Sequence, residues 1–346
     1  METFAVSCVP QRKICNDNKI HGYPTLMFYP PNSIVGTKLQ QGKLDVEEIF
    51  TLAGAPTAPE VGDRGAGPIQ QYSSNDPEKQ NNVAEAYFMR RNRLEAFHDA
   101  HVSFDFAMKT AVFTQNGPLP DKPKQALRDF LLAMKMTLPS SSSMQPVVRS
   151  LLINFESITK SPDAINEIMA KYPPPEPLNN WSEASLQHGT GFTAGLWVLF
   201  HIMSVGLVHW NHDINDDAQK LAPAEMADTL RNYIEHFFQC EECRLNFLAD
   251  FDACMYDRCN RLVTTAVGAS VQQYIQYPLW LFETHNAVNV RLRKERIEQG
   301  IETEASTDEG DVVWPPFAFC PHCWPSPVKD RWNEVQVYRF LQQSYW

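Results

Sequence analysis

One short stretch, Phe237–Cys243, reads FFQCEEC and places Cys240 and Cys243 two residues apart after an aromatic-rich run. Apolar residues at helical spacing predict one helix over 223–239 and another over 244–254, so Cys240 ends the first helix and Cys243 begins the second. A helix N-terminus stabilises negative charge, which lowers the pKa of a thiol there and favours the thiolate that attacks disulfides or flavins. The pattern therefore predicts a cysteine pair that opens and closes a small disulfide.

Two glutamates, Glu241 and Glu242, lie between these cysteines. They add negative charge, so only a moderate shift of the thiol pKa is expected. A Cys-x-x-Cys pair alone also fits a structural disulfide or part of a zinc site. Cys320 and Cys323 repeat the spacing and could complete a four-thiolate zinc site, although the gap between the pairs is wider than in zinc ribbons or fingers.

The chain has 8 cysteines, which form four close pairs: Cys8 with Cys15, Cys240 with Cys243, Cys254 with Cys259, and Cys320 with Cys323. Close pairing with none left over is typical of disulfide-forming proteins in an oxidising compartment. The N-terminus lacks the basic start and apolar stretch of a signal peptide, which by itself points to the cytosol. The cysteines and the N-terminus therefore favour different compartments.

A predicted helix over 193–208 carries Trp197 and His201 on one face, because they are four residues apart. An indole beside an imidazole forms a stacking and hydrogen-bonding platform for a planar ring such as adenine. A role for Trp197 in the core alone is the competing interpretation.

A predicted helix over 277–298 carries three neutral polar side chains close together, namely His285, Asn286 and Asn289. They suggest recognition of a polar ligand, and Arg291 with its basic neighbours could bind a diphosphate. The competing interpretation is a solvated helix face. Farther back, two histidines at helical spacing, His98 and His101, could form half of a metal site, but ordinary satisfied histidines are far more common.

The bulk properties of the 346 residues exclude several classes of protein. The net charge of −11 argues against a nucleic-acid partner. The longest apolar run, Leu196–Val208, is interrupted by polar residues and is predicted to be too short to cross a bilayer. The sequence holds no Gly-x-Gly-x-x-Gly after a strand, no Gly-x-Ser-x-Gly and no His-Glu-x-x-His, which argues against Rossmann folds, serine hydrolases and zincins.

The chain divides into four predicted regions. Residues 1–55 read as αβ, with strands near Thr3–Val6 and Pro24–Tyr29. Residues 56–80 are rich in proline, glycine and polar residues and predict a linker. Residues 81–175 and 176–346 show helical periodicity, so the predicted fold class is mainly α.

Several of these motifs together resemble a known family. The FFQCEEC stretch, the earlier Leu196–His201 and the later His285–Leu292 look like the FAD-binding domain of Erv-type sulfhydryl oxidases. Cys320 and Cys323 resemble the C-terminal Cys-x-x-Cys of the quiescin sulfhydryl oxidases. Residues 8–29 resemble the second half of a thioredoxin domain. The resemblance implies an Erv-type helical bundle at 176–346, a degenerate Erv-like repeat without flavin at 81–175 and a partial thioredoxin-like domain at 1–55.

The resemblance also implies roles for individual residues. Cys243 is expected next to the flavin, and Cys240 is expected to receive electrons from outside. Cys8–Cys15 and Cys320–Cys323 are expected as disulfides, whereas Cys254 and Cys259 have no clear family counterpart and are expected to form a local one. The expected FAD contacts are Thr190, Trp197, His201, Asn246, Phe282, His285, Asn286, Asn289, Arg291 and Trp314.

The chain departs from the family at its start. The family's thioredoxin domain carries its own Cys-x-x-Cys, whereas this chain has no such pair before residue 240. The expectation is an N-terminally shortened chain, which also accounts for the missing signal peptide. The full-length protein is then expected in the secretory pathway, within the ER or Golgi lumen or secreted.

The resemblance implies an FAD-dependent thiol oxidase that forms disulfides and reduces O2 to H2O2. Its expected substrates are reduced proteins and small dithiols, with poor activity on proteins in the absence of the thioredoxin pair. A monomer with an internal pseudo-dimer is expected, without a nucleic-acid partner or stable membrane insertion. The competing hypotheses are a zinc-bound helical scaffold on Cys240, Cys243, Cys320 and Cys323 and a disulfide-stapled binding module.

Overall fold

The computed structural model describes residues 27–28, 37–38, 77–114, 117–175, 181–182, 185, 191–300, 312–315, 317, 320–324 and 332–346. The chain divides into two compact units, Met1–Ser73 and Ser74–Trp346.

The described part of the first unit is a short antiparallel ribbon. It pairs β1 (Met27–Phe28) with β2 (Thr37–Lys38), and Met27 lies opposite Lys38. β1 falls inside the predicted strand Pro24–Tyr29. The rest of the predicted thioredoxin-like remnant, including Cys8 and Cys15, lies outside the described residues.

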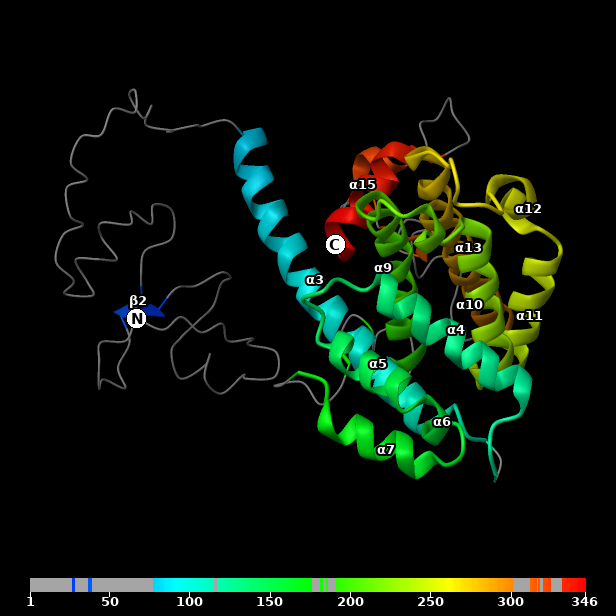
Figure 1. Ribbon diagram of the computed structural model, residues 1–346. Helices are drawn as coiled ribbons and strands as arrows, with labels where there is room; N and C mark the ends of the chain where they lie inside the picture. The colour runs from blue at the N-terminus through cyan, green and yellow to red at the C-terminus, as the bar shows by residue number, and fades with distance from the viewer. Residues whose placement is uncertain are drawn as a thin grey trace. The chain divides into compact units, whose positions relative to one another are not determined.

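The second unit is helical wherever it is described, which confirms the predicted mainly α class (Figure 1). Its α-helices are α3 (Pro77–Thr110), α4 (Asp121–Thr137), α5 (Met144–Ile153), α6 (Phe155–Ile158), α7 (Pro162–Lys171), α9 (Phe192–Asp213), α10 (Pro223–Phe237), α11 (Glu241–Asp252), α12 (Arg258–Arg261), α13 (Val271–Glu298) and α15 (Glu334–Tyr345). Three short 3-10 turns join them: η1 (Asp217–Gln219), η2 (Met255–Asp257) and η3 (Pro321–Cys323). The predicted linker overlaps the start of α3, which begins at Pro77.

The central element is α9, which packs against α3, α4, α13 and α15 (Figure 1). It has 22 residues and a hydropathy of 1.6, so by length and composition it could cross a membrane. The helix predicted over 193–208 was therefore too short, because α9 continues to Asp213. Because 72% of its most apolar window is buried inside the fold, the packing accounts for its composition as that of a core helix.

Two glycines on α9 allow neighbouring helices to approach closely. A Cβ added at Gly195 would lie 2.1 Å from the Ser103 hydroxyl oxygen on α3. A Cβ added at Gly206 would lie 1.7 Å from the carbonyl oxygen of Thr137 on α4. The residues at both positions must therefore lack a side chain for α9 to occupy the centre of the unit.

The apolar stripe predicted on α4 is buried, with Leu127, Phe130, Leu131 and Met134 all in the core. Phe130 stacks on Tyr233 of α10, with ring centroids 3.8 Å apart. The helices of 81–175 and those of 176–346 thus share one hydrophobic core. The boundary near residue 175 remains a prediction about domain origin, since packing does not separate the two regions.

A buried carboxylate on α3 fixes the segment that leads into α9. Asp99 Oδ1 accepts a hydrogen bond from the Ser182 backbone N–H at 2.7 Å, and its Oδ2 accepts from the Ser185 hydroxyl at 2.6 Å. The Trp181 indole donates to the Ser103 hydroxyl at 2.6 Å. These bonds satisfy a carboxylate that burial would otherwise make costly.

The helix that carries the predicted polar ligand residues begins earlier than its pattern indicated. α13 starts at Val271 rather than Tyr277, and Pro278 lies inside it. Ser270 and Gln273 form a capping box at its N-terminus, which satisfies two backbone donors. The same helix continues to Glu298, as predicted.

Candidate active site

The Cys-x-x-Cys pair forms a disulfide at the first turn of α11, with Cα atoms 5.3 Å apart. Cys240 is the N-cap of α11, and its sulfur accepts a hydrogen bond from the Cys243 backbone N–H at 3.3 Å. The prediction that Cys240 ends the preceding helix was wrong, because α10 already ends at Phe237. Both sulfurs consequently lie at the N-terminus of the same helix, where the helix dipole favours negative charge.

The two cysteines differ in accessibility. Cys240 is exposed, whereas Cys243 is partly buried. Glu241 and Glu242 are exposed beside them, so solvent screens their charges. The Arg244 guanidinium donates to the carbonyl of Phe238 at 3.1 Å and thereby ties α11 to the end of α10. An external thiol would therefore reach Cys240 more readily than Cys243.

A cluster of aromatic rings lies where α9 meets α13. Trp197 stacks on His285, with ring centroids 4.3 Å apart and an angle of 4° between the planes. His201 Nε2 lies 3.0 Å from His285 Nδ1, which is hydrogen-bonding distance. Trp197 and His201, four residues apart on α9, have ring centroids 6.4 Å apart. The closest ring contacts therefore join the two helices rather than neighbours on one helix.

His201 is the buried centre of this cluster. Burial lowers its pKa from 6.5 to about 3, so the ring is neutral at physiological pH. Its Nδ1 is buried without a hydrogen-bond partner. A buried ring nitrogen without a hydrogen-bond partner costs free energy, and a ligand atom or a water that bonds to it would remove this cost.

Trp314 and Tyr345 complete the cluster from the C-terminal part of the chain. Tyr345 of α15 stacks on His201, with centroids 5.5 Å apart and an angle of 5°. The centroid of the Trp314 ring lies 5.5 Å from that of His201 and 5.8 Å from that of Tyr345. Tyr345 was not among the predicted site residues, although the apolar spacing of 334–345 could have indicated a helix.

Asn286 forms two hydrogen bonds with the backbone of Trp314. Its side-chain oxygen accepts from the Trp314 backbone N–H at 2.9 Å, and its amide nitrogen donates to the Trp314 carbonyl at 2.8 Å. Asn286 is also buried. In this structure it holds the backbone of Trp314 against α13 and so positions the Trp314 ring near His201.

The remaining predicted contacts lie in varied surroundings. Phe282 is buried and contacts Trp314, with ring centroids 6.2 Å apart. Arg291 forms an ion pair with Glu295 at 3.3 Å on the same helix. Asn246 and Asn289 are partly buried, and no contact places either in the ring cluster. Thr190 lies outside the described residues.

The ring cluster fits a planar heteroaromatic group such as the rings of FAD. It offers aromatic faces and the buried His201 Nδ1, which lacks a partner. Trp197 and His285 are already in contact, so a ligand ring would lie on an outer face or require the two rings to separate.

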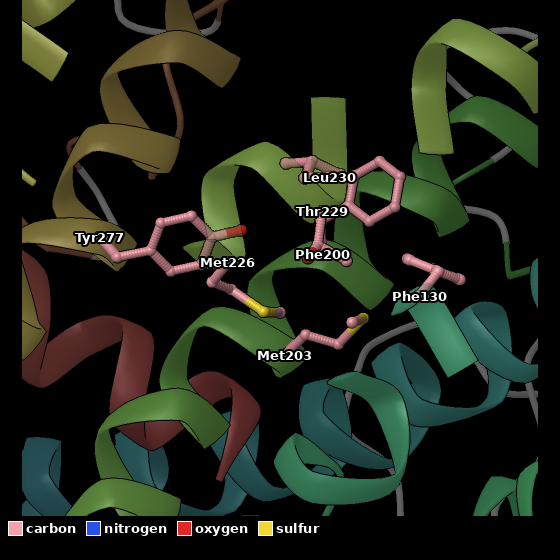
Figure 2. A pocket seen from close by; sticks show the side chains of 7 residues that line it. All are labelled: Phe130, Phe200, Met203, Met226, Thr229, Leu230 and Tyr277. Carbon is pink, nitrogen blue, oxygen red and sulfur yellow. The ribbon is translucent and has the colours of Figure 1, made fainter. Parts of the chain in front are cut away.

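An apolar crevice elsewhere in the core does not fit that role. The crevice is too narrow to hold a water molecule, and Figure 2 shows its lining by Phe130, Phe200, Met203, Met226, Thr229, Leu230 and Tyr277. None of the predicted site residues lines it. A ligand ring cannot enter so narrow a space, so the crevice is a packing gap between α4, α9, α10 and α13.

A four-cysteine zinc site requires thiolates, which a disulfide does not provide. The structure pairs Cys320 with Cys323 and Cys254 with Cys259, in addition to the α11 pair. Within the described ranges, no group of three or more His, Cys, Asp or Glu side chains could hold a metal ion. The geometry therefore favours disulfides over the zinc scaffold.

Comparison with protein families places the site in a known domain. Residues 194–308 match the model of the Erv1/Alr family. The matched segment contains the Cys240–Cys243 pair together with Trp197, His201 and His285.

Curated relatives extend the similarity over most of the chain's length. Sulfhydryl oxidase 2 of Arabidopsis thaliana is 25% identical over 353 residues, which is 96% of this chain and 64% of the relative. Sulfhydryl oxidase 1 of rice is 26% identical over 96% of this chain and 63% of the relative. Human sulfhydryl oxidase 1 is 32% identical over 42% of this chain and 17% of the relative. This chain thus spans less than two thirds of the length of each of these relatives.

A solved structure shows the same fold. The sulfhydryl oxidase fragment of human QSOX1 matches 72% of this chain and 94% of its own length, with a TM-score of 0.51 and 20% sequence identity. Together with the family match and the plant relatives, this result confirms the resemblance to the quiescin sulfhydryl oxidases.

Proposed function

We propose that the Erv/Alr domain of this chain is an FAD-dependent thiol oxidase that forms disulfides from dithiols and reduces O2 to H2O2. One observation carries the proposal: a Cys240–Cys243 disulfide, with Cys240 exposed, starts α11 inside the segment that matches the Erv1/Alr family. The names of the relatives support the reaction class. The proposed domain division is a flavin domain at 176–346, a degenerate repeat at 81–175 and a thioredoxin-like remnant at 1–55.

The accessibility of the two sulfurs sets the order of exchange. A substrate thiolate attacks the Sγ of Cys240, the more exposed cysteine, and the Cys240–Cys243 bond breaks. Cys243 leaves as a thiolate within the first turn of α11, where backbone N–H groups favour negative charge. A second substrate thiolate then attacks the substrate sulfur of the mixed disulfide. The substrate leaves as a disulfide, and two electrons now reside in the Cys240–Cys243 dithiol.

The ring cluster would hold the cofactor. FAD, when bound, supplies a two-electron acceptor that returns the cysteine pair to the disulfide and transfers the electrons to O2. Trp197, His285 and Trp314 offer aromatic faces to its rings, and neutral His201 offers the Nδ1 that lacks a partner. Asn286 positions Trp314 through the two backbone hydrogen bonds.

The wider setting is also a proposal. The names of the relatives and the paired cysteines support reduced proteins and small dithiols as substrates and the secretory pathway as location. The packing of α3 and α4 against α9 and α10 supports a monomer, because these helices cover surfaces that a second copy would otherwise use.

Oxygen consumption tests the proposed reaction. The purified chain loaded with FAD is expected to consume O2 and release H2O2 in equal amounts when dithiothreitol is added. Cys240→Ser and Cys243→Ser should each abolish turnover, whereas the control Cys320→Ser/Cys323→Ser should retain it. Stoichiometric zinc without flavin, or undiminished turnover in Cys243→Ser, would overturn the proposal.

A further inference from the structure

A second disulfide lies at the opposite end of α11 from the redox pair. Cys254 and Cys259 close a six-residue loop just after this helix ends at Asp252. The 12 residues of α11 separate the two disulfides by about 18 Å along the helix axis. Sulfurs so far apart cannot exchange within a folded chain, so Cys254–Cys259 has no place in the relay through Cys240 and Cys243.

The loop has an unusual backbone. Cys254, Tyr256 and Asp257 have φ angles of 57°, 56° and 57°, in the left-handed region that favours glycine. Side chains that occupy this region cost free energy, and surrounding contacts must offset that cost. The Trp280 indole contributes such a contact by donating to the Met255 carbonyl at 3.2 Å. Opening the disulfide would remove the covalent restraint on a backbone that is already unfavourable.

A fixed guanidinium lies beside one of the two sulfurs. Arg258 Nη2 is 3.5 Å from Cys259 Sγ, and Cys259 is exposed. The Arg258 side chain is only 13% exposed, because its guanidinium carbon lies 3.6 Å from the centroid of the Phe251 ring and its Nε donates to the Phe251 carbonyl. A guanidinium held in this way stabilises a thiolate on Cys259.

Carboxylates near Arg258 reduce this effect without cancelling it. Asp228 on α10 lies 3.9 Å from Arg258 Nη1 and is 60% exposed. Asp252 is engaged by Arg231 through two hydrogen bonds of 3.0 and 3.1 Å. Asp257 accepts a hydrogen bond from the Asn260 amide at 2.7 Å. Among the described residues, Arg258 is therefore the charged group in contact with the Cys259 sulfur. Asp228 pairs with the other terminal nitrogen of Arg258 and is mostly exposed, whereas Asp252 and Asp257 are engaged by Arg231 and Asn260.

We propose that Cys254–Cys259 is a second exchangeable disulfide, which reacts with external dithiols independently of flavin. Cys259 is the more exposed cysteine, but Arg258 makes it the better leaving group, so the leaving group rather than exposure sets the order here. A dithiol thiolate attacks Cys254 Sγ, the Cys254–Cys259 bond breaks, and Cys259 leaves as a thiolate beside Arg258. The second thiolate of the dithiol attacks its partner sulfur in the mixed disulfide and frees Cys254. The dithiol leaves as a disulfide with two electrons transferred to the cysteine pair, and an external disulfide reverses the sequence.

Single-thiol variants test the assignment of Cys259 as the leaving group. Both variants carry Cys240→Ser/Cys243→Ser, which removes the redox pair of α11. Adding Cys254→Ser leaves Cys259 as the free thiol of the loop, and adding Cys259→Ser leaves Cys254. The rate of iodoacetamide alkylation is followed against pH for each thiol. The alkylation rate of Cys259 is expected to rise with a pH midpoint about one unit below that of Cys254. Near neutral pH, Cys259 should therefore be alkylated up to about tenfold faster than Cys254. Arg258→Gln should remove the difference and Arg258→Lys should retain part of it.

Reduction of the intact pairs is the second measurement. In the Cys240→Ser/Cys243→Ser chain, mass spectrometry after alkylation should find Cys254–Cys259 open at lower dithiothreitol concentrations than Cys320–Cys323, whose Cys323 is buried. Equal midpoints for the two loop thiols with Arg258 intact would overturn the proposal. So would opening of Cys320–Cys323 before the loop pair. Both results are independent of oxidase activity, because the relay cysteines are absent.

Discussion

The sulfurs of Cys240 and Cys243 are adjacent, yet the fold treats them differently. Cys240 is the exposed N-cap of α11, and Cys243 lies one turn inward and is partly buried. The local sequence predicted the redox pair and its helix, but it placed Cys240 on the wrong helix. Cap positions depend on where the preceding helix ends, and that end at Phe237 follows from packing against neighbours rather than from spacing.

The exposed glutamates predict a charge preference among substrates. Glu241→Gln/Glu242→Gln removes two negative charges next to Cys240, so anionic thiols should approach more readily. We expect kcat/KM for 2-mercaptoethanesulfonate to rise several-fold relative to that for neutral 2-mercaptoethanol, with the difference shrinking at high salt.

The control for this charge effect is Asp250→Asn, which removes a charge farther along α11. It should leave the ratio of the two rates unchanged. A ratio that is equal in the wild type and in the double variant would show that the two glutamates do not select substrates.

The ring cluster shows which residues local spacing can find. Trp197 and His201 share a face of α9, as their spacing predicted, but the closest ring partner of both is His285 on α13, and His201 also stacks on Tyr345. Tyr345 comes from a helix more than a hundred residues away in the chain, so no local pattern could place it against His201. Asn286 holds the backbone of Trp314, which its local sequence did not indicate, and its contact with a ligand stays a prediction.

Helix boundaries, like the ring contacts, were predictable only where a local sequence signal marks them. The apolar stripe on α4 and the start of α10 at Pro223 were predictable, since periodicity and a proline at the first turn are local signals. The early start of α13 was missed, although Ser270 and Gln273 carry a capping-box pattern. The full length of α9 was missed because its last turns are set by contacts with other helices.

Close packing at α9 predicts a strong response to a single methyl group. Gly206→Ala would place a Cβ 1.7 Å from the Thr137 carbonyl oxygen, which is backbone and cannot rotate away. In an exposed helix this change would stabilise by about 1 kcal/mol. Here we expect the clash to lower the free energy of unfolding by about 1–3 kcal/mol, measured by urea denaturation.

A matched change on the exposed face of α9 is the control for this variant. Thr193→Ala lies on the same helix and should change stability by less than about 0.5 kcal/mol. If Gly206→Ala were as stable as the wild type, α9 and α4 could not be as close as described.

The second unit as a whole should lose stability on mild acidification. Burial lowers the pKa of His201 to about 3 and that of His101 to about 4, against 6.5 for an unperturbed histidine. Between pH 6.5 and 4 these two histidines therefore bind protons in the unfolded chain but stay neutral in the folded chain. The free energy of unfolding consequently falls as the pH falls. Each histidine should remove about 2 kcal/mol between pH 7 and pH 5.

Urea denaturation at the two pH values measures this loss. His201→Gln should reduce the dependence on pH by about half, whatever its effect on stability at pH 7. His212→Asn, at an exposed histidine, should leave the dependence unchanged. An unchanged slope in His201→Gln would contradict the buried neutral state of His201.

Anaerobic mixing tests most directly whether Cys240–Cys243 is the route of electrons to the flavin. The FAD-loaded chain is mixed with dithiothreitol without oxygen, and flavin absorbance is followed. We predict rapid bleaching in the wild type and in Cys254→Ser/Cys259→Ser. In Cys243→Ser, which should still bind FAD, the absorbance should persist. Bleaching of Cys243→Ser at the wild-type rate would show that electrons reach the flavin without this pair and would contradict the account.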